Sequence, residues 1–326
     1  MKSREENFLY TPYSSEDLLN RVNLREGEKR LGENIVSEEK KRFVIIGVEE
    51  SVGPVANLGN PGAEGGFEPF VSTFLNIQAN RFLLGKGVTI AGRISALNRF
   101  SDLKKNRVLV EELDDFVLDV LNKYVAADQI PILIGGGHNN AFPLMKFAAQ
   151  RLKKGINVVN LDPHADYRKQ EGRHSGNAFS YAFQQGFLEK YHVIGLHENY
   201  NSEEMLTRLE KDGHYFTIFE DYLAGQANIN EDFVNVCKDN MKTPLGVELD
   251  MDSIIDMPSS ARTPSGMTLE RARIYLKTVS NVENVAYLHL PEAAPSTTQE
   301  NVVVGKSLSY LVSDFIKTVN KREFIK

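Results

Sequence analysis

The chain has 326 residues and a formal net charge of −6, from 44 Asp and Glu against 38 Lys and Arg. This length can bury a large core, and the acidic balance argues against a general nucleic-acid binder, which needs a concentrated basic surface. Cys237 is the only cysteine, which excludes an intrachain disulfide and a thiolate metal cluster. No apolar run reaches the roughly 18 to 20 residues that span a bilayer. We therefore expect a soluble, cytoplasmic protein that binds neither membranes nor nucleic acid.

The polar opening of the chain, to about residue 40, contains one amphipathic stretch, 15–22, which Ser14 or Ser15 could cap as a short helix. We expect residues 1–40 to form an extension packed on or flanking the core, and residues 41–326 to form a single domain. After the first apolar run, 43–48, comes a long loop rich in Gly, Pro and Asn. Because it is too long for a simple connection, we expect it to be functional.

Apolar runs and helically spaced apolar residues alternate from residue 43 to the C-terminus. This alternation predicts βα units with right-handed crossovers, and therefore one largely parallel sheet with helices on both faces. The predicted strands are 43–48, 130–134, 156–161, 192–196, 215–219, 245–249 and 285–290, and the predicted helices are 71–79, 108–127, 142–154, 177–187, 203–211, 231–240, 268–280 and 301–320.

Ionisable side chains follow three of the predicted strands, where each strand ends. In open parallel sheets, ligands bind outside the carboxyl ends of the strands. Alternation along an extended chain directs residues i, i+2 and i+4 to one face. The residues concerned are His138 after Gly135–Gly137, then Asp162, His164 and Asp166, and finally Asp250 and Asp252.

Four carboxylates and two imidazoles converging on one spot would repel one another and resist desolvation unless cations held them together. Oxygen and nitrogen ligands without sulfur favour manganese or magnesium over a structural zinc. Six ligands suit two ions about 3.5 to 4 Å apart, with bridging carboxylates. Either acidic motif alone could instead be a helix cap or a turn. A phosphate-binding loop at Gly135–Gly137 is disfavoured, because the nucleotide-binding glycine motifs are missing.

These motifs resemble those of the ureohydrolase family of arginases, agmatinases and formimidoylglutamases, over about residues 43–315. The family signatures Gly-Gly-(Asp or Gly)-His and Asp-x-His-x-Asp are matched at 135–138 and 162–166. The loop 59–70 resembles the glycine-rich segment ahead of the family's first long helix, with Phe67 in place of a proline. The resemblance implies a three-layer α/β/α fold with a mainly parallel, about eight-stranded sheet. It also implies two Mn²⁺ ions per chain.

The third family signature, Asp-x-Asp, has two possible registers here, because Glu248 precedes Asp250 and Asp252. We choose Asp250 and Asp252, since residues 261–264 then fall close to the family's Gly/Thr/Pro-containing loop. The resemblance then implies the ligands of both ions: Asp162 and Asp250 bridge, His138 and Asp166 complete one site, and His164 and Asp252 complete the other.

The chemistry that the resemblance implies is hydrolysis of a C–N bond other than a peptide bond. A water between two divalent ions loses its proton near neutral pH and attacks the planar carbon of a guanidinium or formimidoyl group. Asp166 can orient this nucleophile and carry its proton to the leaving nitrogen. The family glutamate that receives the cationic group has no direct match: either Glu292 has shifted to that role or His289 takes its place.

Several departures from the arginase pattern resemble formimidoylglutamases. They are Gly-Gly-Gly-His, Asp166-Tyr167-Arg168 and Ser175-Gly176-Asn177. His174 lies one position from the place of the arginase proton shuttle. The preferred substrate is N-formimidoyl-L-glutamate, giving glutamate and formamide, with Arg168 gripping an acid group. The further substrate-binding candidates are Ser175, Asn177, His197, Asn199, Tyr200, Arg262 and His289.

Two alternatives remain open at this point. One is a guanidino hydrolase of the arginase or agmatinase type, which releases urea. The other, from a different class, is a binding or regulatory protein that kept the fold and lost the chemistry, as the altered glutamate region and the shifted His174 suggest. A homo-oligomer is also possible, because family members are commonly trimers or hexamers.

Overall fold

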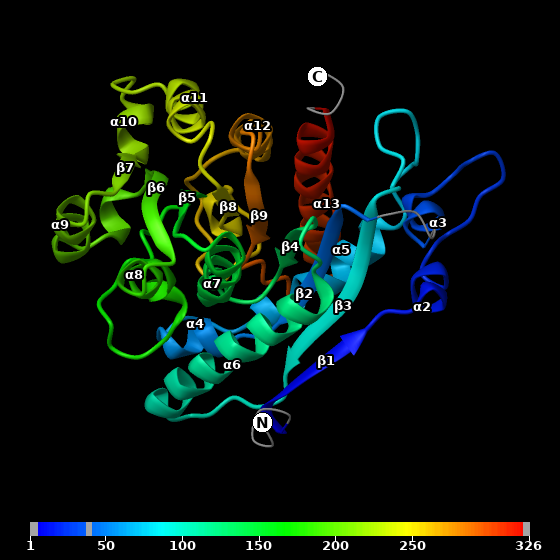
Figure 1. The fold of residues 1–326 in the computed structure, drawn as a ribbon, viewed down its shortest axis with the longest axis horizontal. Coiled ribbons are helices and arrows are strands. Elements are labelled where there is room, and N and C mark those ends of the chain that lie inside the picture. Colours follow the sequence, from blue (N-terminus) through cyan, green and yellow to red (C-terminus); the bar gives the residue numbers. More distant parts are fainter. Residues whose placement is uncertain (1–5, 37–40, 322–326) are drawn as a thin grey trace.

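The computed structural model describes residues 6–36 and 41–321, and its centre is one sheet of nine strands (Figure 1). We predicted a mainly parallel sheet of about eight strands, and every neighbouring pair is parallel except β1 with β3. The order across the sheet is β1-β3-β2-β4-β9-β8-β5-β6-β7. The strands are β1 (Phe8–Pro12), β2 (Phe43–Glu49), β3 (Val88–Ala96), β4 (Ile130–Ile134), β5 (Ile156–Leu161), β6 (Leu188–Leu196), β7 (Tyr215–Ile218), β8 (Leu245–Leu249) and β9 (Val285–Leu290).

Helices cover both faces of the sheet, so the fold is the three-layer α/β/α arrangement that we expected. Side chains of α5 (Phe67–Phe74), α11 (Ile229–Asp239), α12 (Leu269–Val279) and α13 (Thr298–Lys321) build the core on one face. Those of α6 (Leu103–Tyr124), α7 (Ala141–Leu152), α8 (Ala178–Gln184) and α9 (Glu203–Lys211) build the core on the other. The described chain also has the short α-helices α2 (Ser15–Leu19), α3 (Leu31–Ile35), α4 (Val52–Ala56) and α10 (Phe219–Leu223).

The central strands are apolar on both faces, which explains their unbroken apolar runs. In β2, Ile45 packs into one core and its neighbours Val44 and Ile46 into the other, all at most 1% exposed. A strand buried on both sides is stabilised by β-branched side chains at every position, because each of them removes apolar surface from water. The two cores therefore hold the sheet between the helix layers.

Two strands, β1 and β3, were missed by the sequence analysis. Phe8–Pro12 pairs antiparallel with β3 at one edge of the sheet, and Phe8 is buried against α6. The opening segment thus contributes a strand, while Leu18 and Leu31 of α2 and α3 lie in a core. Residue 40, where we expect the extension to end, lies outside the described residues.

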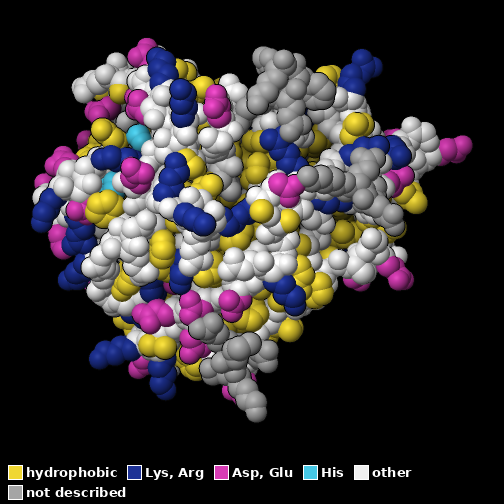
Figure 2. Space-filling view, in the orientation of Figure 1, with side chains coloured by type: hydrophobic (Ala, Val, Ile, Leu, Met, Phe, Trp, Pro, Cys, Tyr) yellow, Lys and Arg dark blue, Asp and Glu magenta, His cyan; other side chains and the backbone are white. Residues whose placement is uncertain are grey.

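The strand order brings the polar motifs together. Neighbours β4, β9, β8 and β5 are parallel, so the segments after them emerge side by side at the carboxyl edge of the sheet. Acidic and basic side chains are interspersed over the face seen in Figure 2. Within the described residues, no helix is long and apolar enough to cross a membrane.

Candidate metal centre

The turn after β4 carries His138 into the protein interior. Gly135 and Gly136 have φ of +84° and +71°, a left-handed conformation that glycine adopts without steric cost. A Cβ on Gly135 would lie 2.8 Å from the Val48 carbonyl oxygen, so this turn needs the bare backbone. The chain then enters a short 3₁₀ turn that begins at His138, whose side chain is completely buried.

The first ligand cluster surrounds Nδ1 of His138. Oδ2 atoms of three aspartates lie close to this nitrogen: Asp250 at 2.9 Å, Asp166 at 3.1 Å and Asp162 at 3.2 Å. Such separations match the edge, about 3.0 Å, of an octahedron with metal–ligand bonds of about 2.1 Å. Nδ1 has no hydrogen-bond partner among the described residues, so the interior offers it nothing but these carboxylates. A divalent cation fits this donor set.

A second cluster lies beside the first and shares Asp162 with it. Nδ1 of His164 is 3.6 Å from Oδ1 of Asp162 and 3.5 Å from Oδ2 of Asp252. Oδ1 of Asp162 also accepts the His164 amide at 2.7 Å, and its Oδ2 accepts Nδ2 of Asn160 at 2.8 Å. All six predicted ligands thus fall into two adjoining groups, with Asp162 in both and Asp250 in the first.

Glu248, the alternative register, lies one step behind these clusters. Its Oε2 is 3.4 Å from Nε2 of His138 and 2.6 Å from Nδ1 of His289, and none of these three side chains is exposed. A carboxylate at Nε2 favours the tautomer with the proton there, which leaves Nδ1 free to bind a cation. The geometry therefore favours Asp250 and Asp252 as ligands, with Glu248 positioning His138. His289 sits beside Glu248, away from the pocket described below.

The electrostatics of the clusters are strongly perturbed by burial. Burial, opposed by the His138 ring 3.1 Å away, raises the pKa of Asp166 to about 6. Burial acts in the same direction on Asp162, but His138 and His164 outweigh it and lower the pKa of Asp162 to about 2. Closely packed carboxylates with divergent pKa values are typical of functional sites.

Glu292, just after β9, ties the first cluster together. Its Oε1 accepts the backbone N–H of His138 at 2.8 Å, its own N–H donates to the Gly136 carbonyl at 2.8 Å, and Ser260 Oγ donates to its Oε2. Burial, with the charge of Asp250 next, raises the pKa of Glu292 to about 8. Its φ of +69° is costly for a residue with a Cβ, and such strain concentrates at functional sites.

The long loop after β2 supports the same turn, through a residue that the sequence analysis missed. Glu50 is 1% exposed and accepts the Gly137 N–H at 2.7 Å, the Gly53 N–H at 2.9 Å and Asn140 Nδ2 at 2.8 Å. It thereby fixes the loop that carries His138. A lone glutamate after an apolar strand carries no local signal for this role, because its partners are distant in sequence.

A pocket of about 460 Å³ opens beside the clusters. His164 and Asp166 form its floor on the metal side, and Tyr200 stacks on the His164 ring at 5.2 Å between centroids. Arg168, which we predicted, lines the pocket and pairs with Glu171 at 2.8 Å. The structure adds wall residues that the sequence analysis did not select: Asn57, Lys169, Ser202, Glu204, Met205 and Arg208.

Other predicted site residues are placed elsewhere. His174 is completely buried: its Nδ1 accepts the Gly176 N–H at 3.1 Å and its Nε2 lies 3.3 Å from Glu171. Burial, then the charges of Arg107 and Arg168, lower the pKa of His174 to about 3, so it is neutral. This placement fits a structural role rather than proton transfer.

The remaining candidates divide between the interior and the surface. Buried Asn177 accepts from Arg173 at 2.6 Å and braces its loop, and Ser175 is buried beside it. His197 packs between Tyr200 and Phe219 and is 6% exposed. Asn199 and Arg262 are on the surface, with Arg262 bonded to Glu300 at 3.2 Å. None of these five candidates lines the 460 Å³ pocket.

Comparison with known proteins places this geometry in a family. The model of the Arginase family matches residues 42–313. Formimidoylglutamase from Streptococcus pyogenes serotype M12 is 22% identical over 286 residues, which is 84% of each chain. In fold, the chain is similar to Trypanosoma cruzi formiminoglutamase with Mn²⁺ (TM-score 0.69, 19% identity, 88% of this chain and 98% of that one) and to formimidoylglutamase from Bacillus subtilis (TM-score 0.71, 18% identity, 95% and 93%). Because the family model covers most of the sequence, the chain belongs to the arginase family.

Proposed function

We propose that this protein hydrolyses N-formimidoyl-L-glutamate to L-glutamate and formamide, using two Mn²⁺ ions. The observation that carries the proposal is the pocket beside the ligand clusters, whose floor is His164 and Asp166 and whose wall carries Arg168 and Arg208. A substrate with two carboxylates and one cationic amidine matches a pocket that is acidic at its floor and has arginines on its wall. The formimidoylglutamases among its relatives add support.

The six ligand residues would hold the ions in the two groups already described. His138, Asp162, Asp166 and Asp250 would hold one ion, and Asp162, His164 and Asp252 the other. Divalent ions at such a site supply Lewis-acid activation of water for attack on a planar carbon.

The chain itself supplies orientation and proton handling. Arg168 and Arg208 line the pocket wall and each pairs with a glutamate at 2.8 Å, Glu171 and Glu204 respectively. A substrate carboxylate would take the place of such a glutamate. Asp166 faces both the cluster and the pocket, so its carboxylate can hold a proton on the way to the leaving nitrogen. Glu292 contributes a further buried carboxylate at the cluster, held by His138 and Ser260.

The deciding experiment is a product assay on the Mn²⁺-loaded protein. It is incubated separately with N-formimidoyl-L-glutamate, L-arginine and agmatine, and formamide and urea are measured. We expect formamide from the first substrate and little urea from the others. Urea as the sole product would replace this proposal by a guanidino hydrolase. Bound Mn²⁺ without turnover of any of the three would favour a binding protein.

A further inference from the structure

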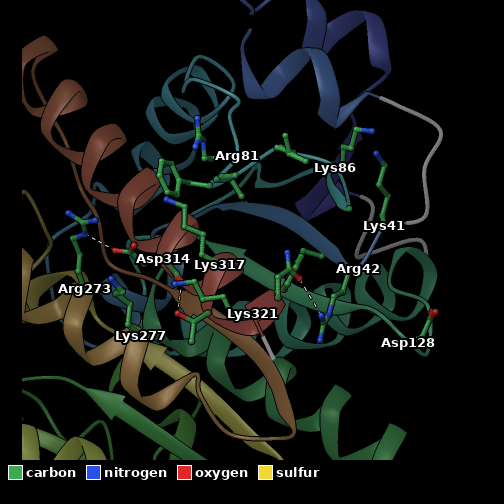
Figure 3. A pocket seen from close by; sticks show the side chains of 17 residues that line it. Lys41, Arg42, Arg81, Lys86, Asp128, Arg273, Lys277, Asp314, Lys317 and Lys321 are labelled. Atoms are coloured by element: carbon green, nitrogen blue, oxygen red, sulfur yellow. Dashed lines mark hydrogen bonds and ion pairs between the residues drawn. The ribbon is translucent and has the colours of Figure 1, made fainter. Parts of the chain in front are cut away.

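A second, larger cavity lies at the opposite edge of the sheet from the ligand clusters. It encloses about 1190 Å³ and is lined by the start of β2, the loop before β3 and the C-terminal turns of α12 and α13 (Figure 3). Its walls carry eight Lys and Arg side chains against two Asp, in a chain whose net charge is −6. The lining cations are Lys41, Arg42, Arg81, Lys86, Arg273, Lys277, Lys317 and Lys321.

Half of these cations are engaged within the chain. Lys41 donates to the Ile35 carbonyl at 2.9 Å, Arg42 to Asn320 at 3.2 Å, and Arg273 pairs with Asp314 at 2.6 Å. Lys86 also has an interaction of its own. The four others, which we call the open cations, are Arg81, Lys277, Lys317 and Lys321, and none of them has an ion pair with a described residue.

The arrangement of the open cations is not explained by the stability of the helices alone. Lys277 and Lys321 lie in the last turns of α12 and α13, where a positive charge favours the helix dipole. Lys317, however, is four residues before Lys321, and like charges at this spacing repel. Arg81 comes from a separate loop and faces the same cavity. Figure 3 shows Lys277, Lys317 and Lys321 gathered beside Asp314, with Arg81 across from them.

Apolar side chains lie beside these charges. Phe82 is 73% exposed and Leu84 50% exposed, and both line the cavity next to Arg81. In Figure 2, Lys and Arg side chains edge the hollow near the C-terminal end of α13. Ammonium groups bind phosphate as point charges, and an exposed ring offers a face for a flat apolar group. The cavity is also large enough for a ligand of nucleotide size.

We propose that this cavity binds a phosphorylated small molecule that carries at least two phosphate groups and an apolar or aromatic group, such as a nucleoside diphosphate. Its phosphates contact the open cations, and its flat group lies against Phe82. This site is separate from the metal centre, because it lies at the amino ends of β2 and β3, whereas the ligand clusters lie at the carboxyl edge of the same parallel sheet.

Isothermal titration calorimetry of the metal-loaded protein at low ionic strength tests the site, with ADP, pyrophosphate, inorganic phosphate and adenosine as separate probes. The double variant Lys277→Glu/Lys317→Glu is compared with the control Lys104→Glu/Lys238→Glu, which changes the net charge equally at exposed lysines outside the cavity. We expect the wild type to bind ADP. The cavity variant should have an affinity for ADP lower by about tenfold or more, and the control should have the affinity of the wild type.

A second variant separates the two halves of the site. Phe82→Ala should lower the affinity for ADP and leave the affinity for pyrophosphate unchanged, because only the apolar contact is lost. The proposal is overturned if the wild type binds neither ADP nor pyrophosphate, or if the cavity variant and the control bind ADP equally, which would place ADP outside this cavity. Thermal unfolding without ligand shows whether each variant is folded.

Discussion

The carboxyl and amino edges of the sheet both gather like charges, but in different surroundings. Asp162, Asp250 and Asp252 are at most 3% exposed, whereas Lys277 and Lys321 at the other edge are open to solvent. Buried like charges cost far more than solvated ones, so the acidic edge needs cations to be stable, while water and salt screen the basic edge. We therefore expect the acidic edge to hold metal permanently, and the basic edge to bind and release its ligand.

The largest effect is expected from removing a ligand at the acidic edge. Asp250→Asn should lower both metal content and turnover by about 100-fold or more, since even outer partners of metal ligands typically change affinity by 10- to 100-fold. Elemental analysis and the formamide assay measure both. The matched control is Asp256→Asn, at an exposed position six residues on whose φ of +56° asparagine tolerates. Unchanged metal content in Asp250→Asn would contradict the ligand assignment.

A smaller loss of metal affinity is expected from a substitution at Glu248, which lies one step behind the cluster. Glu248→Gln keeps the shape of the side chain but removes the charge that holds His138 and His289. We expect Mn²⁺ affinity to fall by about 10-fold to 100-fold. Competition with a chelator of known affinity gives the value. If the loss equals that of Asp250→Asn or exceeds it, Glu248 is itself a ligand.

A substitution in the pocket wall should affect substrate binding more than the chemical step. Arg168→Gln should raise KM for N-formimidoyl-L-glutamate by about tenfold with a smaller change in kcat, because the lost ion pair holds the substrate throughout the reaction. Arg262→Gln is the control, since Arg262 also has a glutamate partner but lies outside the pocket. Equal KM values for the two variants would remove Arg168 from the site.

Stability at acid pH should depend on His174. Its pKa is about 3 in the folded chain, against an ordinary 6.5, because burial and three nearby arginines disfavour the charged form. Between these values the unfolded state binds a proton that the folded state does not. The free energy of unfolding therefore falls as pH drops from about 6.5 to about 3, by up to about 1.4 kcal/mol per pH unit from this group. Urea unfolding of His174→Asn should show a shallower dependence, and an identical slope would refute the assignment.

The smallest effect is expected from relieving repulsion at the basic edge. Lys317→Gln should raise the free energy of unfolding by a few tenths of a kcal/mol at low salt, because like charges four residues apart on a helix repel by about this amount. The gain should vanish at high salt, where screening removes the repulsion. Lys104→Gln is the control. A loss of stability in Lys317→Gln would mean that Lys317 is paired within the chain.

Local sequence patterns were sufficient to predict a strand where the segment itself carries a clear hydrophobic pattern. The strand runs before His138, Asp162 and Asp250 were all predicted, because buried parallel strands are apolar throughout. β3 was missed although its residues alternate between buried and half-buried, and β1 was missed because five residues with an exposed Leu9 carry little signal. The pairing of β1 with β3 joins segments about 80 residues apart, which no local pattern specifies.

The sequence by itself determined the alternation of strands and helices and the residue types at the strand ends, and these were sufficient to indicate the family. Only the tertiary structure decided which groups meet. β4 and β5 are consecutive in the chain, yet β9 and β8 lie between them, and this order brings Glu248 behind His138 and Glu292 onto its backbone. The same folding buries His174 and collects Arg81, Lys277 and Lys317 around one cavity. Contacts between residues far apart in sequence depend on strand order and helix packing, and these are properties of the whole chain.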